Sequence, residues 1–279
     1  MRNYPIRMRM IFFTLLAAAL SGLAVLRAAD SGTTVPVTTP AVAATTTDLV
    51  KKPKNVFVIV HGAWGGGWAF KEVDDLLTAD GNKVYRPTLT GQGEKVHLAS
   101  PEVDLTTHIT DIVNVILWED LHDVILVGHS YGGMVITGVA DRVPDRIKHI
   151  VYLDAFLPLD GESVNTAAGG MNLGKVDATG FIPPKKGAME SPPPHDVPMS
   201  EKTLSEPIAL KNQAAVAKIP ATFVLFIPPG KTLETAPFHA FYERAKARGW
   251  DVQTLNSDHN AQWSHPQEEV AILEKAAGE

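Results

Sequence analysis

From Asn55 onward, the chain alternates between uninterrupted apolar runs and longer stretches in which apolar residues recur every three or four positions. The apolar runs predict buried strands, at residues 55–60, 83–89, 124–127, 147–153, 221–227 and 252–255. The amphipathic stretches predict helices, at residues 68–78, 105–118, 134–143, 238–248 and 266–277. Because strands alternate with helices, we expect an α/β fold with a mostly parallel, doubly wound sheet.

One long segment, residues 157–212, interrupts this alternation. It is rich in glycine and proline, as in GFIPPKKG and SPPPHDVP, and it has no clear period. We expect an insertion at the C-terminal edge of the sheet, a cap, rather than a separate domain. The folded unit, including this cap, is predicted to cover residues 54–279.

The start of the chain has a different character. Three arginines among the first nine residues precede an uncharged apolar run, 10–26, which is followed by small residues. This pattern predicts a secretory signal peptide over residues 1–28, with cleavage after Ala28 and a periplasmic or secreted product. The length of the run also fits an uncleaved anchor that would tether the protein to a membrane. Residues 29–53, rich in Thr, Ala and Pro, predict a flexible linker.

Composition narrows the possible chemistry. An apolar fraction of 45% is sufficient for a packed core, and a net charge of −6 gives no reason to expect nucleic acid or anionic membrane as a partner. The chain has no cysteine, which excludes disulfides, thiolate catalysis and a Cys-ligated zinc. The histidines lack metal-ligand spacing, so we expect neither a metal nor a cofactor.

The sequence Gly128-His129-Ser130-Tyr131-Gly132 matches the motif GxSxG. The motif alone is a weak signal, but here it follows a predicted strand and opens a predicted helix. That is the setting of a nucleophile elbow, in which small residues permit a strained turn and the serine hydroxyl projects from it. We therefore predict Ser130 as a nucleophile.

A glycine-rich loop, HGAWGGGW at residues 61–68, follows the first predicted strand. Such a loop brings backbone amides close to a ligand, and it lacks the Lys-Ser/Thr and the GxGxxG spacing of phosphate-binding loops. We expect the amides of Ala63 and Tyr131 to form an oxyanion hole.

A general base is expected late in the chain. His259 lies after the last predicted strand and before the last predicted helix, where it could activate Ser130. His265 and His239 remain alternatives.

Several stretches resemble the α/β-hydrolase superfamily, and within it the group that contains plant methylesterases, hydroxynitrile lyases and many bacterial esterases. They are VHGAWGGGWAF, RPTLTGQGEKVHLAS, LVGHSYGGMV and VYLDAFLP. The resemblance implies an α/β-hydrolase fold and a Ser130–His259 pair. In the plant lyases of this group a threonine stands at the position of Gly62 and a lysine at that of Asn260, so both differences favour ester hydrolysis.

More than one residue is a candidate for the acid that would complete a catalytic triad with Ser130 and His259. The resemblance implies an aspartate after the strand at 221–227, but that strand is followed by PPGKTLE, whose first carboxylate is Glu234. Asp154 ends the strand at 147–153, next to the nucleophile strand, and some lipases of the superfamily take their acid from that strand. We predict Asp154, while Glu234, Asp258 or no acid at all remain open.

Together these features predict a serine hydrolase that cleaves small carboxylic esters through an acyl-enzyme intermediate. The expected partner is a small-molecule ester, with no stable membrane insertion after signal cleavage. Two alternatives are a ligand-binding member without catalysis and a hydroxynitrile-lyase-like enzyme. Four aromatic residues are candidates either for the substrate pocket or for the core: Trp64, Trp68, Phe156 and Trp263.

Overall fold

The computed structural model describes residues 52–169, 171 and 173–278. The predicted signal peptide and almost all of the predicted linker lie outside these residues. Within them, no helix has both the length and the apolar character needed to cross a membrane.

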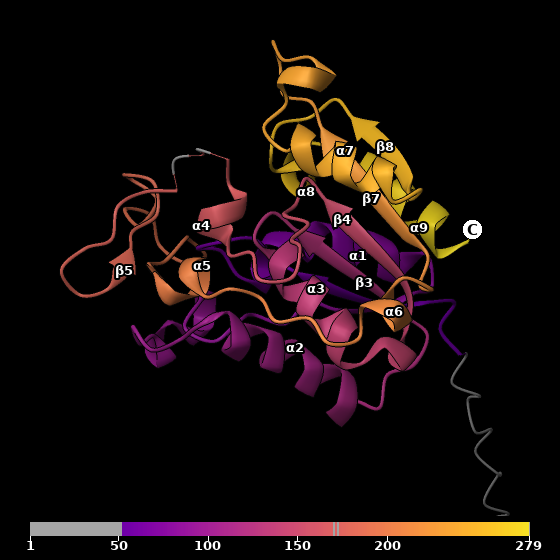
Figure 1. Cartoon of the computed structure of the whole chain (residues 1–279), viewed down its shortest axis with the longest axis horizontal. Helices are drawn as coiled ribbons and strands as arrows, with labels where there is room; N and C mark the ends of the chain where they lie inside the picture. The colour runs from indigo at the N-terminus through magenta and orange to yellow at the C-terminus, as the bar shows by residue number, and fades with distance from the viewer. Residues whose placement is uncertain (1–51, 170, 172, 279) are drawn as a thin grey trace, which may run out of the picture. The chain divides into compact units, whose positions relative to one another are not determined.

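A six-stranded sheet forms the centre of the fold, in the order β2-β1-β3-β4-β7-β8, with every neighbouring pair parallel. Its strands are β1 (Val56–Val60), β2 (Lys83–Tyr85), β3 (Val124–His129), β4 (Ile147–Leu153), β7 (Ala221–Phe226) and β8 (Asp251–Leu255). The parallel sheet expected from the uninterrupted apolar runs is confirmed. Figure 1 shows the central strands running side by side, with α2 and α3 packed against each other along the sheet.

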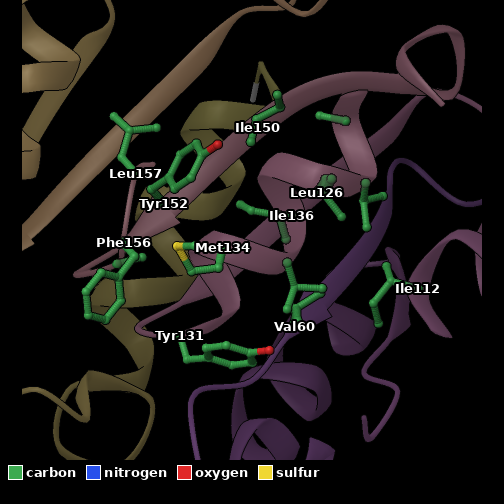
Figure 2. Close-up of a cluster of buried hydrophobic side chains, with 14 of the residues drawn as sticks. Val60, Ile112, Leu126, Tyr131, Met134, Ile136, Ile150, Tyr152, Phe156 and Leu157 are labelled. Carbon is green, nitrogen blue, oxygen red and sulfur yellow. The ribbon is translucent and has the colours of Figure 1, made fainter. Parts of the chain in front are cut away.

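Helices cover both faces of the sheet. They are α1 (Lys71–Ala79), α2 (Leu105–Trp118), α3 (Gly132–Arg142), α7 (His239–Ala247) and α9 (Pro266–Ala277). Buried residues of α2, α3 and α7 form one apolar cluster with the sheet, and those of α1 and α9 form a second. Figure 2 shows part of the first cluster, where Val60, Leu126 and Ile136 converge between β1, β3 and α3.

The segment between β4 and β7 contains only short elements. They are α4 (Val164–Ala167), the antiparallel pair β5 (Phe181–Ile182) and β6 (Met199–Ser200), α5 (Lys202–Ser205) and α6 (Gln213–Val216). Figure 1 shows α4, α5 and β5 grouped to the left of the central strands. The remaining helical turns are short: the 3₁₀ turns Gly67–Phe70, Gly93–Leu98, Pro144–Arg146 and Leu233–Thr235, and α8 (Ala261–Ser264).

Two elements differ from the sequence-based expectation. The strand expected over 83–89 ends at Tyr85, because Pro87 has no backbone N–H to continue a ladder and the amide of Leu89 instead donates to His61 Nε2 at 3.1 Å. The helix expected over 68–78 is divided into a 3₁₀ turn, Gly67–Phe70, and α1.

One helix of the second cluster carries a buried carboxyl group. Glu269 of α9 is fully buried, and neither of its carboxyl oxygens has a hydrogen-bond partner among the described residues. Burial disfavours the ionised form and raises the pKa of Glu269 to about 8. The side chain therefore stays protonated in the folded protein at pH values where it is ionised in the unfolded chain.

This difference predicts a pH-dependent stability. The unfolded Glu269 releases its proton above about pH 4.5 and the folded one only near pH 8, so the free energy of unfolding should fall between these values by an amount on the order of 4 kcal/mol. Glu269→Gln should remove this contribution and be more stable than the wild type at pH 8. Urea unfolding at pH 5 and pH 8 measures the difference. Glu268→Gln, at the exposed neighbouring position, is the matched control and should retain the wild-type slope.

Candidate active site

Ser130 lies at the sharp turn between β3 and α3. Its backbone has a φ of 55°, a region that a non-glycine residue rarely adopts. The chain packs very closely around this turn, and only glycine fits at the two positions after Tyr131. A Cβ on Gly132 would lie 2.4 Å from the carbonyl oxygen of Val60, and a Cβ on Gly133 only 2.0 Å from that of Phe156. The sequence GHSYGG therefore forms the strained strand–turn–helix expected of a nucleophile elbow.

The side chains of Ser130, His259 and Asp154 form one continuous hydrogen-bonded chain. Ser130 Oγ lies 2.9 Å from His259 Nε2, and His259 Nδ1 lies 2.6 Å from Asp154 Oδ2. An ionised carboxylate only accepts hydrogen bonds, so Nδ1–H of His259 donates to Asp154 and Nε2 is left to accept from the hydroxyl of Ser130. The structure thus brings together three residues that the sequence analysis selected separately.

Asp154 immediately follows β4 and is 1% exposed. Its second carboxylate oxygen, Oδ1, accepts a hydrogen bond from the backbone amide of Phe226 at the end of β7, at 3.2 Å. Burial raises the pKa of Asp154, and the hydrogen bond and charge of His259 oppose that rise. Both oxygens therefore have partners, which compensates in part for the cost of burying the group.

The other candidate acids and bases lie elsewhere. Glu234 is exposed and accepts a hydrogen bond from the Thr232 hydroxyl, whereas Asp258 accepts from the amide of Asn260. His265 contacts the hydroxyls of Ser257 and Ser264, and His239 stacks on Tyr242. No hydrogen bond joins any of these four groups to Ser130 among the described residues.

His259 is held through both its ring and its backbone. Its ring stacks on Phe238, with the two planes 6° apart and the centroids separated by 5.2 Å. Its backbone carbonyl accepts a hydrogen bond from Nε2 of His129, the buried residue before Ser130, at 2.7 Å. Burial and the neighbouring His259 lower the pKa of His129 well below the ordinary value, so His129 is a neutral donor that ties the His259 loop to the elbow.

Two further histidines form hydrogen bonds near the two amides of the expected oxyanion hole, those of Tyr131 and Ala63. His108 accepts from the hydroxyl of Tyr131 at 2.9 Å, which fixes the side chain that follows Ser130. His61, whose pKa is lowered to about 4 by burial, ties the glycine-rich loop to Leu89. Among the described residues, the amides of Ala63 and Tyr131 donate to no backbone carbonyl, and Ala63 lines the same cavity as Ser130.

A cavity of about 240 Å³ opens above Ser130 and His259. Its walls include Trp64, Trp68 and Trp263, whereas Phe156 is 3% exposed and belongs to the core. Larger cavities, of about 540 Å³ and 350 Å³, contain neither Ser130 nor His259.

Three polar residues of the 240 Å³ cavity were not predicted from the sequence: Lys185, Asp196 and Gln262. The first two belong to the segment between β4 and β7, which has no periodic pattern that could place them. Gln262 could have been suspected only from its nearness in sequence to His259. Among the described residues, no group of acidic and histidine side chains has the geometry of a metal site.

Comparison with known proteins gives a consistent picture. Over 108 residues the chain is 55% identical to a carbendazim hydrolyzing esterase from Nocardioides sp. (strain SG-4G), a match that covers 39% of this chain and 45% of that relative. It is 28% identical over 247 residues to the pFDCC methylesterase MES16 of Arabidopsis thaliana, covering 79% and 93% of the two chains. The chain spans about half the length of the first curated relatives that it matches.

The fold has solved counterparts. An extracellular alpha/beta-hydrolase from a Paenibacillus species superimposes with a TM-score of 0.65 and 25% sequence identity, covering 80% of this chain and 98% of that structure. A model of the alpha/beta hydrolase family matches residues 57–272, which include every strand of the central sheet except the first residue of β1. The chain therefore belongs to the alpha/beta hydrolase family.

Proposed function

We propose that the protein is a serine esterase that cleaves small carboxylic esters through an acyl-enzyme intermediate. The observation that carries the proposal is the hydrogen-bonded chain from Ser130 Oγ through His259 to the buried carboxylate of Asp154. The similarity to a carbendazim hydrolyzing esterase and to a methylesterase supports the same reaction class.

In the first half of the proposed reaction, Ser130 Oγ attacks the ester carbonyl carbon while His259 Nε2 takes the hydroxyl proton. The carbonyl oxygen becomes an oxyanion, which the amides of Ala63 and Tyr131 would stabilise. Asp154 keeps the His259 proton on Nδ1 and stabilises the imidazolium. Collapse of the tetrahedral intermediate breaks the ester C–O bond, and the proton on Nε2 leaves with the alcohol.

In the second half, a water molecule gives a proton to His259 Nε2 and its oxygen attacks the acyl carbon. The proton returns to Ser130 Oγ as the carboxylic acid leaves. A cavity of about 240 Å³ limits the substrate to a small ester.

The environment of Gly62 supports hydrolysis over cyanohydrin cleavage. A Cβ at this position would lie 3.1 Å from both Ser130 Cβ and His129 Nδ1, so the elbow has no room for a larger residue without a shift. The threonine that the resemblance gives for lyases at this position does not fit the present packing.

The first prediction concerns the nucleophile and the base. Ser130→Ala or His259→Ala should reduce kcat for a short-chain 4-nitrophenyl ester by at least about 10³-fold, because each removes the attacking group or its activation. A fluorophosphonate probe should label the wild type at Ser130, and Ser130→Ala should abolish the label. Ser191→Ala, at an exposed serine outside the cavity, is the control and should keep the wild-type rate. Full activity of Ser130→Ala would refute the assignment, and a wild type without label would favour a binding protein.

A second prediction separates the candidate acids. Asp154→Asn should reduce kcat roughly 10³–10⁴-fold, because an amide cannot stabilise the imidazolium and favours the wrong tautomer of His259. Glu234→Gln changes an exposed carboxylate outside the site and should leave kcat within about twofold. The two variants are compared on one ester at one pH. Equal rates for Asp154→Asn and the wild type would overturn the role of Asp154.

We further propose that residues 1–28 direct export of the chain to the periplasm or beyond the cell. The arginines and the apolar run before Ala28 support this proposal. Expression of the full chain in a bacterial host should give an extracytoplasmic product that begins at Ala29, which fractionation and N-terminal sequencing would establish. A product that begins at Met1 and pellets with membranes would instead indicate the uncleaved anchor.

A further inference from the structure

The cavity above Ser130 contains a second carboxylate. Asp196 belongs to the segment between β4 and β7, is half-buried, and lines the same cavity as Ser130 and His259. Its Oδ1 lies 3.9 Å from the point where a Cβ on Gly65 would stand, so the carboxylate lies next to the glycine-rich loop. Within the described part of the chain, no hydrogen bond or ion pair reaches this side chain.

The backbone around Asp196 is fixed to the elements that build the active site. The amide of Val197 donates to the carbonyl of Trp64 at 2.9 Å, and Gln92 Nε2 donates to the carbonyl of Pro198 at 3.3 Å. Trp64 in turn donates from Nε1 to the carbonyl of Ile182 at 3.0 Å. These bonds hold Asp196 beside the loop that carries Ala63, so its position in the cavity is built into the fold.

A half-buried carboxylate without a protein partner has lost part of its hydration on folding. Burial raises the pKa of Asp196, and the charges of His195 and Lys185 only oppose this rise from a distance, without forming an ion pair. Lys185 is solvent-exposed, so its charge is more strongly screened than that of Asp196. A ligand that donates hydrogen bonds or carries a positive charge would restore the lost interactions.

The rest of the cavity suits a flat, nitrogen-bearing ligand. The rings of Trp68 and Trp263 stack at 5.8 Å with planes 14° apart and present an aromatic wall. Gln262 also lines the cavity, but it is 2% exposed and its unpaired Oε1 is buried, so it is not available to a ligand in this arrangement. The aromatic wall and the unpaired carboxylate of Asp196 together attract aromatic and cationic groups.

We propose that Asp196 is a specificity-determining residue that binds a protonated amino group of the substrate. The preferred substrates are then small aromatic esters that carry an amine, with the ester carbonyl at Ser130 and the ammonium at Asp196. The predicted preference in kcat/KM rests on the proposed esterase function. The predicted preference in binding does not, because it can be measured without turnover.

Two esters of the same shape test the proposal. Methyl 4-(aminomethyl)benzoate carries an ammonium group where methyl 4-ethylbenzoate carries a methyl group. The wild type should favour the cationic ester by about tenfold in kcat/KM, and the preference should shrink as salt is raised, because ion pairing is screened. Asp196→Asn should reduce the ratio of the two kcat/KM values to about one. Glu190→Gln removes an equal charge from an exposed position outside the cavity and should keep the wild-type ratio.

Binding to the Ser130→Ala variant separates this inference from the proposed function. By titration calorimetry, the cationic ester should bind about tenfold more tightly than the neutral one, and adding Asp196→Asn should remove the difference. If neither ester is hydrolysed by the wild type but this binding difference is present, the esterase proposal fails and the role of Asp196 stands. If the esters are hydrolysed with equal kcat/KM and bind equally at low salt, the role of Asp196 is overturned.

Discussion

The position of His259 between Ser130 and Asp154 depends on a backbone connection between the ends of β3 and β4. The amide of Ser130 donates to the carbonyl of Leu153 at 3.2 Å, and the amide of Phe156 donates to the carbonyl of Ser130 at 3.0 Å. Because these neighbouring parallel strands end together, Ser130 and Asp154 leave the sheet side by side. His259 can then contact both at once, at 2.9 Å and 2.6 Å, from a loop after β8.

The strand β7 contributes to the same site without a carboxylate. Its last residue, Phe226, donates its amide to Asp154 Oδ1, and Val224 accepts from the amide of Asp154 at 2.8 Å. The loop after β7, with its two prolines and a glycine, carries no acid at the site. The backbone of β7 instead forms hydrogen bonds with Asp154, which comes from β4. Asp154 also adopts a φ of 43°, so the chain turns sharply where it leaves β4. Asp154 is therefore held by the backbone of β7 and by the side chain of His259, from the loop after β8.

Much of this arrangement could be predicted from sequence because local pattern and burial agree. The strand β4 and the helices α2 and α9 match their predicted ranges to the residue, since β4 ends in four consecutive apolar residues and each helix has a clear helical period. The roles of Asp196 and His129 had no such signal. Asp196 is placed at the cavity by long-range backbone contacts such as the bond between Val197 and Trp64, which lie far apart in the chain. A two-residue pair such as β5–β6 is too short to show a period.

The glycine-rich loop connects catalysis with the segment that carries Asp196. Trp64 adopts a φ of 64°, directly after Ala63, and is bonded through its carbonyl to Val197 and through its ring nitrogen to Ile182. The amide of Ala63 is thus one residue away from the backbone that anchors the segment between β4 and β7. A substrate group bound at Asp196 would therefore act on the same short stretch of chain that would receive the oxyanion. In the proposed enzyme, recognition of the distant end of the substrate and stabilisation of the reacting carbonyl would share one hydrogen-bonded support.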